Sequence, residues 1–469
     1  MNLTTNYGDT LTPRPPSESV TINSLSDVVS PTPYPGVNSS RSSRARKRWA
    51  ASMHAMYMIK IFESFLHNPF YSLVLSLRMF GLVINIESRN TRLYAPQNSQ
   101  LRHRISKVLR YLLSTFMLLY ILYYAIRITI TVTSGGFWTN LKVLIHSWIT
   151  FWTVIIFLYR QKQIGSVMLQ IQSLNGFASD YTVVFKRRVM TVITIAWIYL
   201  LVAIVTFFID FSKVKSEDLF AVNFGDLQVS KTIAIIVVYV DTMLNVYFLR
   251  GTLVMIVVTY LLVCHSIEIM FKDLKDFSMA QNRQKRELTL KGLRELKNRH
   301  QLLSSLVYEL DFIFSFMVFL WIVLVLISLC TRVNIIIGSE YSSANIEGWI
   351  SSIWALGITL LIYIGVPLAA SRLSSEFIDS VLAIEMLANT STIKSDVIYY
   401  YELLLFLSRL SMNTILLTCY RFFEIKKQLI LFIALIVIAY YFFVLHYTLV
   451  NLNIKQVLTN NQITTTSAP

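Results

Sequence analysis

The chain has 469 residues, of which 55% are apolar and 14% are charged, and its mean hydropathy is +0.56. A soluble domain of this size does not need so much apolar surface, and several apolar runs reach the roughly 20 residues that span a bilayer. The net charge of +16 would suggest nucleic acid in a soluble protein, but in a membrane protein the positions of the basic residues matter more than their sum. The composition therefore predicts an all-α membrane protein with no nucleic-acid partner.

Residues 1–64 are expected to form a disordered, basic, cytosolic segment, because they are rich in Ser, Thr, Pro and Asn and offer no apolar run for a signal peptide. The cluster RSSRARKR at 41–48 is either part of the cytosolic charge bias or a patch for anionic lipid. Interfacial or re-entrant helices are predicted over 65–107, since the stretch 69–86 is short, amphipathic and interrupted by Arg78.

Seven apolar segments are predicted to cross the membrane. They lie at 108–133, 141–159, 189–209, 232–263, 302–329, 349–369 and 429–452. The fourth would make about 48 Å of helix, which is too long for one simple crossing and short for two. Arg250-Gly251 could mark a turn, but no Pro or Asn-Gly interrupts the segment, so we expect one helix that projects past the bilayer.

The lysines and arginines predict the orientation. Segments 1–107 (with Arg110), 160–188, 264–301 and 370–428 carry 34 basic groups on one side, against 6 on the other, while Arg127 and Arg250 lie within spans. Basic loops stay in the cytosol. We therefore expect a cytosolic N-terminus and an extracellular C-terminus, with residues 454–469 as an extracellular tail.

Two polar helical regions are expected on the cytosolic side. Residues 264–301 read as an amphipathic extension of the fourth span, and 370–428 read as a helical anchor with an amphipathic pair at 374–388 and 396–411. These regions predict a cytosolic helical platform, which is either a place where subunits meet or a solvated hairpin of a monomer. Spans one to six, 108–369, would form the ligand-binding bundle.

The last helix, 429–453, carries a polar stripe. His446, Val450 and Asn453 are spaced i, i+4 and i+7, so they share one helical face, which Tyr447 flanks. Polar side chains deep in a membrane face either a water-filled path or a partner helix. The helix is therefore predicted to line a pore, or else to hydrogen-bond to neighbouring helices.

A ligand pocket is expected in the outer half of the bundle, because small-molecule sites combine apolar and aromatic walls with a few polar groups. The residues that fit this position are His146, Trp148, Tyr239, Asp241, Asn245, Trp321 and Trp354. Asp241 lies about 14 Å down its helix, with Asn245 one turn away on the same face. It would bind a cationic or polyhydroxy ligand, or form a structural pair with His146 or another helix.

Enzyme motifs are missing from the sequence. No phosphate loop, H-E-x-x-H or G-x-S-x-G occurs, and the three cysteines are scattered without metal spacing. We therefore expect no enzymatic activity, no cofactor and no metal site. A secondary transporter is the alternative from another class, although it would show internal repeats and broken helices.

Three segments resemble a known family. They are YSLVLSLRMFGLV before the first span, EFIDSVLAIE, and YYYELLLFLSRLSMNTILLTCYRFFEI before the last helix. With the seven-span, N-inside plan, they resemble the insect gustatory receptors. The family signature is Thr-Tyr, five mostly apolar residues and Gln-Phe. In this chain Tyr447 matches, and His446, Asn453 and Ile454 stand for Thr, Gln and Phe.

This resemblance implies a ligand-gated, non-selective cation channel in the plasma membrane of sensory neurons. It implies a homo- or heterotetramer of gustatory receptors, a small-molecule tastant bound in each subunit, and a pore or gate formed by His446, Tyr447, Val450, Asn453 and Ile454. No acidic ring occurs in the last helix, so strong calcium selectivity is not expected. An odorant receptor of the same superfamily is the alternative within this class.

Overall fold

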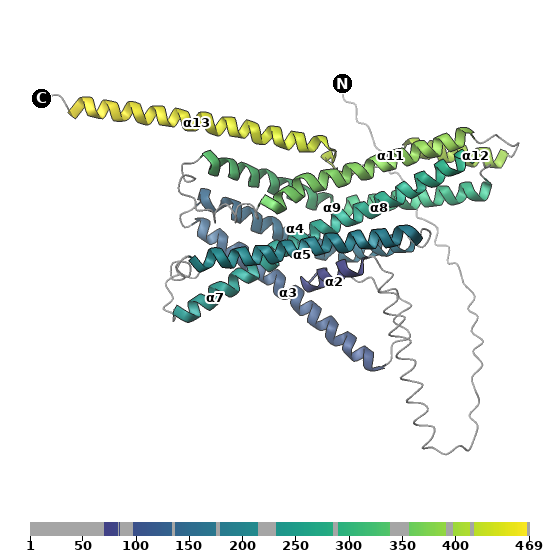
Figure 1. Ribbon diagram of the computed structural model, residues 1–469, viewed down its shortest axis with the longest axis horizontal. Coiled ribbons are helices and arrows are strands. Elements are labelled where there is room, and N and C mark those ends of the chain that lie inside the picture. Colours follow the sequence, from purple (N-terminus) through teal and green to yellow (C-terminus); the bar gives the residue numbers. More distant parts are fainter. Residues whose placement is uncertain are drawn as a thin grey trace, which may run out of the picture. The chain divides into compact units, whose positions relative to one another are not determined.

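The structure, a computed structural model, describes residues 70–82, 84, 97–133, 137–174, 179–213, 231–284, 289–337, 356–390, 397–412 and 417–466. Over these ranges the chain is almost entirely helical (Figure 1). The elements are α2 (Tyr71–Met79), α3 (Gln97–Thr133), α4 (Phe137–Leu174), α5 (Ser179–Lys213), α7 (Lys231–Leu244), η3 (Asn245–Gly251), α8 (Thr252–Arg283), α9 (Leu290–Ile337), η5 (Leu361–Gly365), α11 (Val366–Thr390), α12 (Val397–Met412), β1 (Thr418–Cys419), β2 (Phe423–Glu424) and α13 (Gln428–Thr466). The predicted segment 1–64 lies outside the described residues.

Within the described residues, seven helices are long and apolar enough to cross a membrane, which confirms the predicted seven-span fold. They are Lys107–Thr133, Val143–Leu174, Val184–Thr206, Ile235–Arg283, Leu290–Val333, Leu356–Ala388 and Gln428–Val450. Several extend well past the predicted spans. Helix α13 continues to Thr466, so most of the predicted tail is helical, because neither Gly nor Pro occurs after Gln428 before Pro469.

The fourth span is one continuous helix, as predicted, but its geometry changes in the middle. A π-helical turn, η3, occupies Asn245–Gly251 between α7 and α8, at the position where a turn was considered. Both residues that flank this turn, Leu244 and Thr252, keep right-handed helical backbone angles. The helix is therefore locally wider at this turn, and the chain continues in the same direction.

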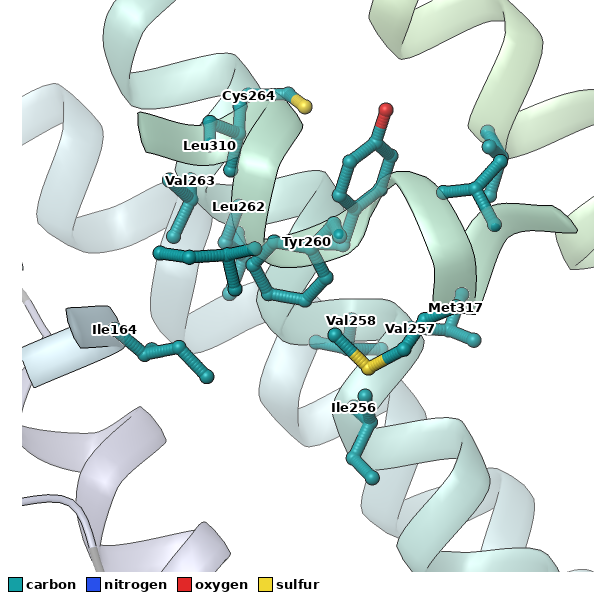
Figure 2. Packing of buried hydrophobic residues seen from close by; sticks show 14 of the residues in the cluster. Ile164, Ile256, Val257, Val258, Tyr260, Leu262, Val263, Cys264, Leu310 and Met317 are labelled. Carbon is teal, nitrogen blue, oxygen red and sulfur yellow. The ribbon is translucent and has the colours of Figure 1, made fainter. Parts of the chain in front are cut away.

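The core is built around α8. Helices α11, α9, α4 and α5 pack on it, and 78% of the residues in the most apolar part of the fourth span are buried. Figure 2 shows one part of this core, where Tyr260 and neighbouring α8 residues lie with Leu310 and Met317 of α9 and Ile164 of α4. A helix that is apolar on all sides is stable only when other helices or lipid surround it, and here other helices do.

The predicted platform helices are joined by ion pairs. The Lys275 ammonium on α8 lies 2.6 Å from a Glu376 carboxylate oxygen on α11, and an Arg294 guanidinium nitrogen on α9 lies 2.8 Å from Glu402 on α12. The hydrogen bond from Arg294 holds the pKa of the Glu402 carboxyl below its usual value. These pairs hold α11 and α12 against the extensions of the fourth and fifth spans.

Candidate functional site

A polar face of α3 meets the start of the fourth span. Tyr120, Tyr124 and Arg127 follow one another at i, i+4 and i+7, so they lie on one side of α3. On the other element, Asp241 lies near the end of α7 and Asn245 begins η3, one turn further. Two spans far apart in the sequence thus bring five polar side chains together.

An ion pair forms the centre of this cluster. A guanidinium nitrogen of Arg127 lies 2.8 Å from Oδ2 of Asp241, and the two side chains are only 14% and 13% exposed. The Tyr120 hydroxyl lies 3.0 Å from Oδ1 of the same carboxylate and 2.7 Å from the Asp241 main-chain oxygen. Both carboxylate oxygens of Asp241 therefore accept a hydrogen bond from α3.

Aromatic rings complete the surroundings of Arg127. Its guanidinium lies 4.9 Å from the centre of the Tyr124 ring and 5.7 Å from that of Tyr123, and the ring centres of Tyr120 and Phe248 are 6.0 Å apart. Stacking on aromatic faces is favourable for guanidinium groups. The cluster is electrically neutral as a whole, so it offers hydrogen bonds and ring faces rather than a free charge.

The structure supplies a partner for Asp241 that the sequence analysis did not name. We considered a ligand or a pair with His146 or another helix; the contact found is with Arg127 and Tyr120 of α3. The signal that could have found it is the presence of Arg127 inside an apolar span, because ionisable residues there usually pair with one another.

The other predicted pocket residues are distributed over the bundle. The Trp148 indole N–H donates a 3.1 Å hydrogen bond to the Thr129 hydroxyl, and His146 and Tyr239 are half-buried. Trp321 is fully buried on α9, with its ring centre 6.0 Å from that of Tyr260.

Tyr260 lies 19 residues after Asp241, which is roughly 28 Å along a helix. Trp321 is therefore not brought close to Asp241. Its indole N–H has no hydrogen-bond partner within the described part of the chain. Trp354 falls outside the described residues.

Helix α2 packs on the π turn that follows the polar cluster. Phe80, at its end, is fully buried and stacks on Trp197 of α5 at 5.3 Å and on Tyr247 of η3 at 4.6 Å. The Tyr247 hydroxyl donates a 2.9 Å hydrogen bond to the Met79 main-chain oxygen. A Cβ atom at Gly251 would lie 2.6 Å from the Phe80 ring, so glycine makes this close approach available. The segment predicted as interfacial or re-entrant thus contacts the helix that carries Asp241.

The last helix has little contact with the rest of its own chain. Only 11% of the residues in its most apolar part are buried, and the predicted stripe residues His446, Tyr447 and Val450 are exposed. Asn453 and Ile454 lie on the same helix, but their side chains are outside the described residues.

Two hydrogen-bonded contacts hold the base of α13. An Asp311 carboxylate oxygen on α9 accepts hydrogen bonds from the Thr418 main-chain N–H at 2.6 Å and from the Thr418 hydroxyl at 3.1 Å. The Tyr363 hydroxyl in η5 donates a 2.8 Å hydrogen bond to the Ile430 main-chain oxygen. The fifth and sixth spans are therefore both tied to the start of α13.

Among the described residues, no group of three or more His, Cys, Asp or Glu side chains is placed so that it could hold a metal ion. The three cysteines are unpaired thiols, and burial raises the pKa of the Cys419 thiol to about 12.

Comparison with solved structures gives a clear similarity of fold. The chain is similar to the insect olfactory receptor OR5 from Machilis hrabei in complex with eugenol, with a TM-score of 0.62 and 11% identity over 80% of this chain and 97% of that one. It is similarly close to another structure of OR5, with a TM-score of 0.61 and 11% identity over 84% of this chain and 98% of that one. No protein-family model and no curated protein matches the sequence. The chain therefore has the fold of an insect olfactory receptor, as the resemblance implied, while the gustatory assignment stays a prediction.

Proposed function

We propose that this chain is a gustatory receptor that acts as a ligand-gated, non-selective cation channel in the plasma membrane of sensory neurons. It would form homo- or heterotetramers, with α13 of each subunit lining a central pore and a tastant bound in the outer half of each bundle. The shared fold with an insect olfactory receptor supports the chemoreceptor class.

The observation that carries the proposal is the exposure of α13. An apolar helix in lipid needs no partner, but His446 and Tyr447 are exposed polar side chains in the last turns of the predicted span. Polar groups within a span usually face water or another protein surface. A ring of α13 helices from several subunits would supply both, with the polar stripe toward water and the apolar positions toward neighbouring helices.

The gate would lie near the outer end of α13. Val450 and Ile454 would form apolar rings that exclude water when closed, and Asn453 would offer amide groups to replace part of a cation's hydration shell. No acidic side chain occurs between Gln428 and Thr466. Cation passage without strong preference for divalent ions follows from this lining.

The proposed tastant site is centred on Asp241 and Asn245 in the outer half of the bundle, where Tyr239, His146, Trp148 and Trp354 are also predicted to lie. Trp321, which packs on Tyr260, lies outside it. Because Arg127 neutralises Asp241, the cluster suits an uncharged small molecule with hydroxyl groups better than a cation. Such a ligand would exchange hydrogen bonds with Asp241 and Tyr120 and stack on the surrounding rings.

An odorant receptor is the second candidate, because both solved structures above are of an olfactory receptor, one of them in complex with eugenol. The two functions differ in ligand class and not in the channel. A panel of non-volatile tastants and volatile odorants, applied to cells that express the full chain, distinguishes them by which class evokes current.

The channel itself is tested with purified full-length protein. Four-fold class averages in detergent and ligand-evoked cation current in liposomes would support the proposal. Monomeric particles that accumulate a solute without passing current would overturn it and favour the transporter alternative.

A further inference from the structure

We propose that the hairpin of residues 417–427 is a membrane anchor that binds the headgroup layer of a bilayer containing anionic phospholipid and holds the start of α13 at that depth. The inference does not depend on channel activity. It rests on the exposed aromatic side chains of the hairpin, its place beside the spans, and its charge.

The hairpin combines buried side chains with exposed aromatic side chains. Its strands pair in antiparallel register, Thr418 with Glu424 and Cys419 with Phe423. The side chains of Leu417, Cys419 and Ile425 are 2% exposed or less. By contrast, Tyr420, Phe422 and Phe423 are 51%, 69% and 40% exposed. Three large aromatic side chains are thus exposed on a hairpin whose other apolar side chains are buried.

The tip keeps an unusual backbone. Tyr420 and Arg421 have φ angles of 48° and 61°, a left-handed conformation that side chains other than glycine rarely adopt. The Phe422 main-chain N–H donates a 2.9 Å hydrogen bond to the Cys419 oxygen, which closes the turn. The left-handed turn is maintained by the surrounding contacts, and it directs Tyr420 and Phe422 to the same outer side.

Those two rings extend an aromatic cluster from α9. Tyr420 lies with its ring centre 5.0 Å from Phe316, and Phe422 lies 5.9 Å from Phe319. The Tyr420 and Phe422 rings are themselves 5.5 Å apart. Phe316 and Phe319 are half-buried side chains of the fifth span, so the hairpin rings continue an aromatic surface of that span.

Charged residues of α4 and α9 lie beside the hairpin, where the predicted second span ends at 159. Arg160 of α4 donates a 3.2 Å hydrogen bond to the Phe312 oxygen of α9, and the next residue back, Asp311, binds Thr418. The apolar part of the last span begins at Gln428, directly after the hairpin. The exposed rings therefore lie where amphipathic aromatic side chains concentrate in membrane proteins.

The charge of the hairpin complements anionic lipid. Residues 417–427 hold three basic side chains, Arg421, Lys426 and Lys427, and one acidic side chain, Glu424, which leaves a net charge of +2. All four are exposed, and Lys426 pairs with Glu424. Basic residues beside a span attract acidic headgroups, with an expected enrichment of about fivefold for each charge.

The test places a fluorophore at Phe422 and compares quenchers. Cys330→Ser removes the half-buried thiol; Cys264 and Cys419 are fully buried and stay unlabelled. Phe422→Cys in this background is labelled and placed in nanodiscs of phosphatidylcholine with phosphatidylserine. Matched controls are Gln284→Cys at the exposed end of α8 and Leu119→Cys on the exposed face of α3.

We expect headgroup spin labels to quench the Phe422→Cys label strongly and aqueous iodide to quench it weakly. Iodide should quench the Gln284→Cys label strongly, and acyl-chain spin labels should quench the Leu119→Cys label strongly. Spin-labelled phosphatidylserine should quench more than spin-labelled phosphatidylcholine. Arg421→Gln with Lys427→Gln should abolish this preference while particles stay monodisperse. Iodide quenching equal to that of Gln284→Cys would overturn the proposal, and so would protection from every quencher, which would mean that a second subunit covers the hairpin.

Discussion

The Tyr363 hydroxyl donates a 2.8 Å hydrogen bond to the main-chain oxygen of Ile430, and this contact joins the sixth span to the first turn of the last helix. Tyr363 belongs to η5, a π-helical turn, and such turns occur frequently at functional sites. Along α13 only Leu429 and Ile433 are buried among the described side chains. The bond therefore belongs to the part of α13 that packs on its own chain.

Tyr363→Phe should remove this hydrogen bond and nothing else. One hydrogen bond contributes about 1 kcal/mol, so ligand-independent current should rise and the half-activating ligand concentration should fall by up to about fivefold. Patch-clamp recording with surface biotinylation measures both. Tyr159→Phe, at an 83% exposed position on α4, is the matched control and should change neither. Unaltered gating in Tyr363→Phe would show that this contact does not hold the closed position.

Asp241→Asn should leave the Arg127 charge without a counter-charge in a mostly buried site. Loss of one partner from a buried pair costs roughly 3–5 kcal/mol, so the thermal midpoint and the surface level of the protein should fall. Glu295→Gln removes the exposed pair with Arg299 and should cost no more than about 0.5 kcal/mol.

The double variant Arg127→Gln with Asp241→Asn should recover much of that stability, because both groups are then neutral and still hydrogen-bonded. The ligand response of this double variant distinguishes a role of Asp241 in ligand binding from a purely structural role. A recovered surface level with a shifted ligand sensitivity would support a binding role, whereas an unchanged sensitivity would leave the pair purely structural. A stable single variant would show that the pair contributes nothing.

The spans could be predicted from the sequence because a membrane requires a minimum length of apolar helix. Each span therefore shows as a continuous apolar run that can be recognised without reference to the other segments. The pairing of Arg127 with Asp241 joins two segments, and their relative rotation is set by packing that no single segment records. The same reason explains α2. Taken alone, its nine residues look interfacial. Phe80, which follows them, nevertheless fits a space left by Gly251, which lies 171 residues later in the chain.

The hairpin before α13 was not predicted either. Its loop, residues 420–422, contains Tyr420 and Arg421 with positive φ angles, where hairpins favour Gly, Asn or Asp, so the sequence lacks the usual signal. We expected a helical anchor over 370–428 with an amphipathic pair at 374–388 and 396–411, and we named no strands after the pair; α12 ends at Met412 and the two strands follow it. The contacts from Asp311 to Thr418 stabilise the irregular segment in place of helical hydrogen bonds.

The orientation rests on 34 basic groups on one side against 6 on the other. A glycosylation acceptor engineered near Ser342, between the fifth and sixth spans, should therefore be modified in cells, while the native acceptors at Asn2 and Asn38 stay bare. A mobility shift removed by a glycosidase measures this. Glycan on native Asn38 would reverse the orientation and place the predicted platform outside the cell.

Substitutions at the outer end of α13 test the pore. Ile454→Ser should wet the apolar constriction and produce ligand-independent current, since a hydroxyl ring offers hydrogen bonds that isoleucine lacks. Asn453→Asp would add up to four carboxylates in a tetramer, which should favour divalent cations and make conductance fall as pH drops toward the carboxylate pKa. Whole-cell recording under bi-ionic conditions at several pH values measures both effects.

The accessibility of introduced cysteine thiols to a water-soluble reagent gives an independent test of whether α13 lines the pore. A charged thiol reagent applied from outside should react with Asn453→Cys, and faster in the presence of ligand, because opening would admit water to that ring. Leu431→Cys, 67% exposed at the opposite end of α13, should react more slowly from that side. If Asn453→Cys never reacts and Ile454→Ser alters neither leak nor gating, α13 does not line the pore, and its exposed polar stripe must face a partner helix instead.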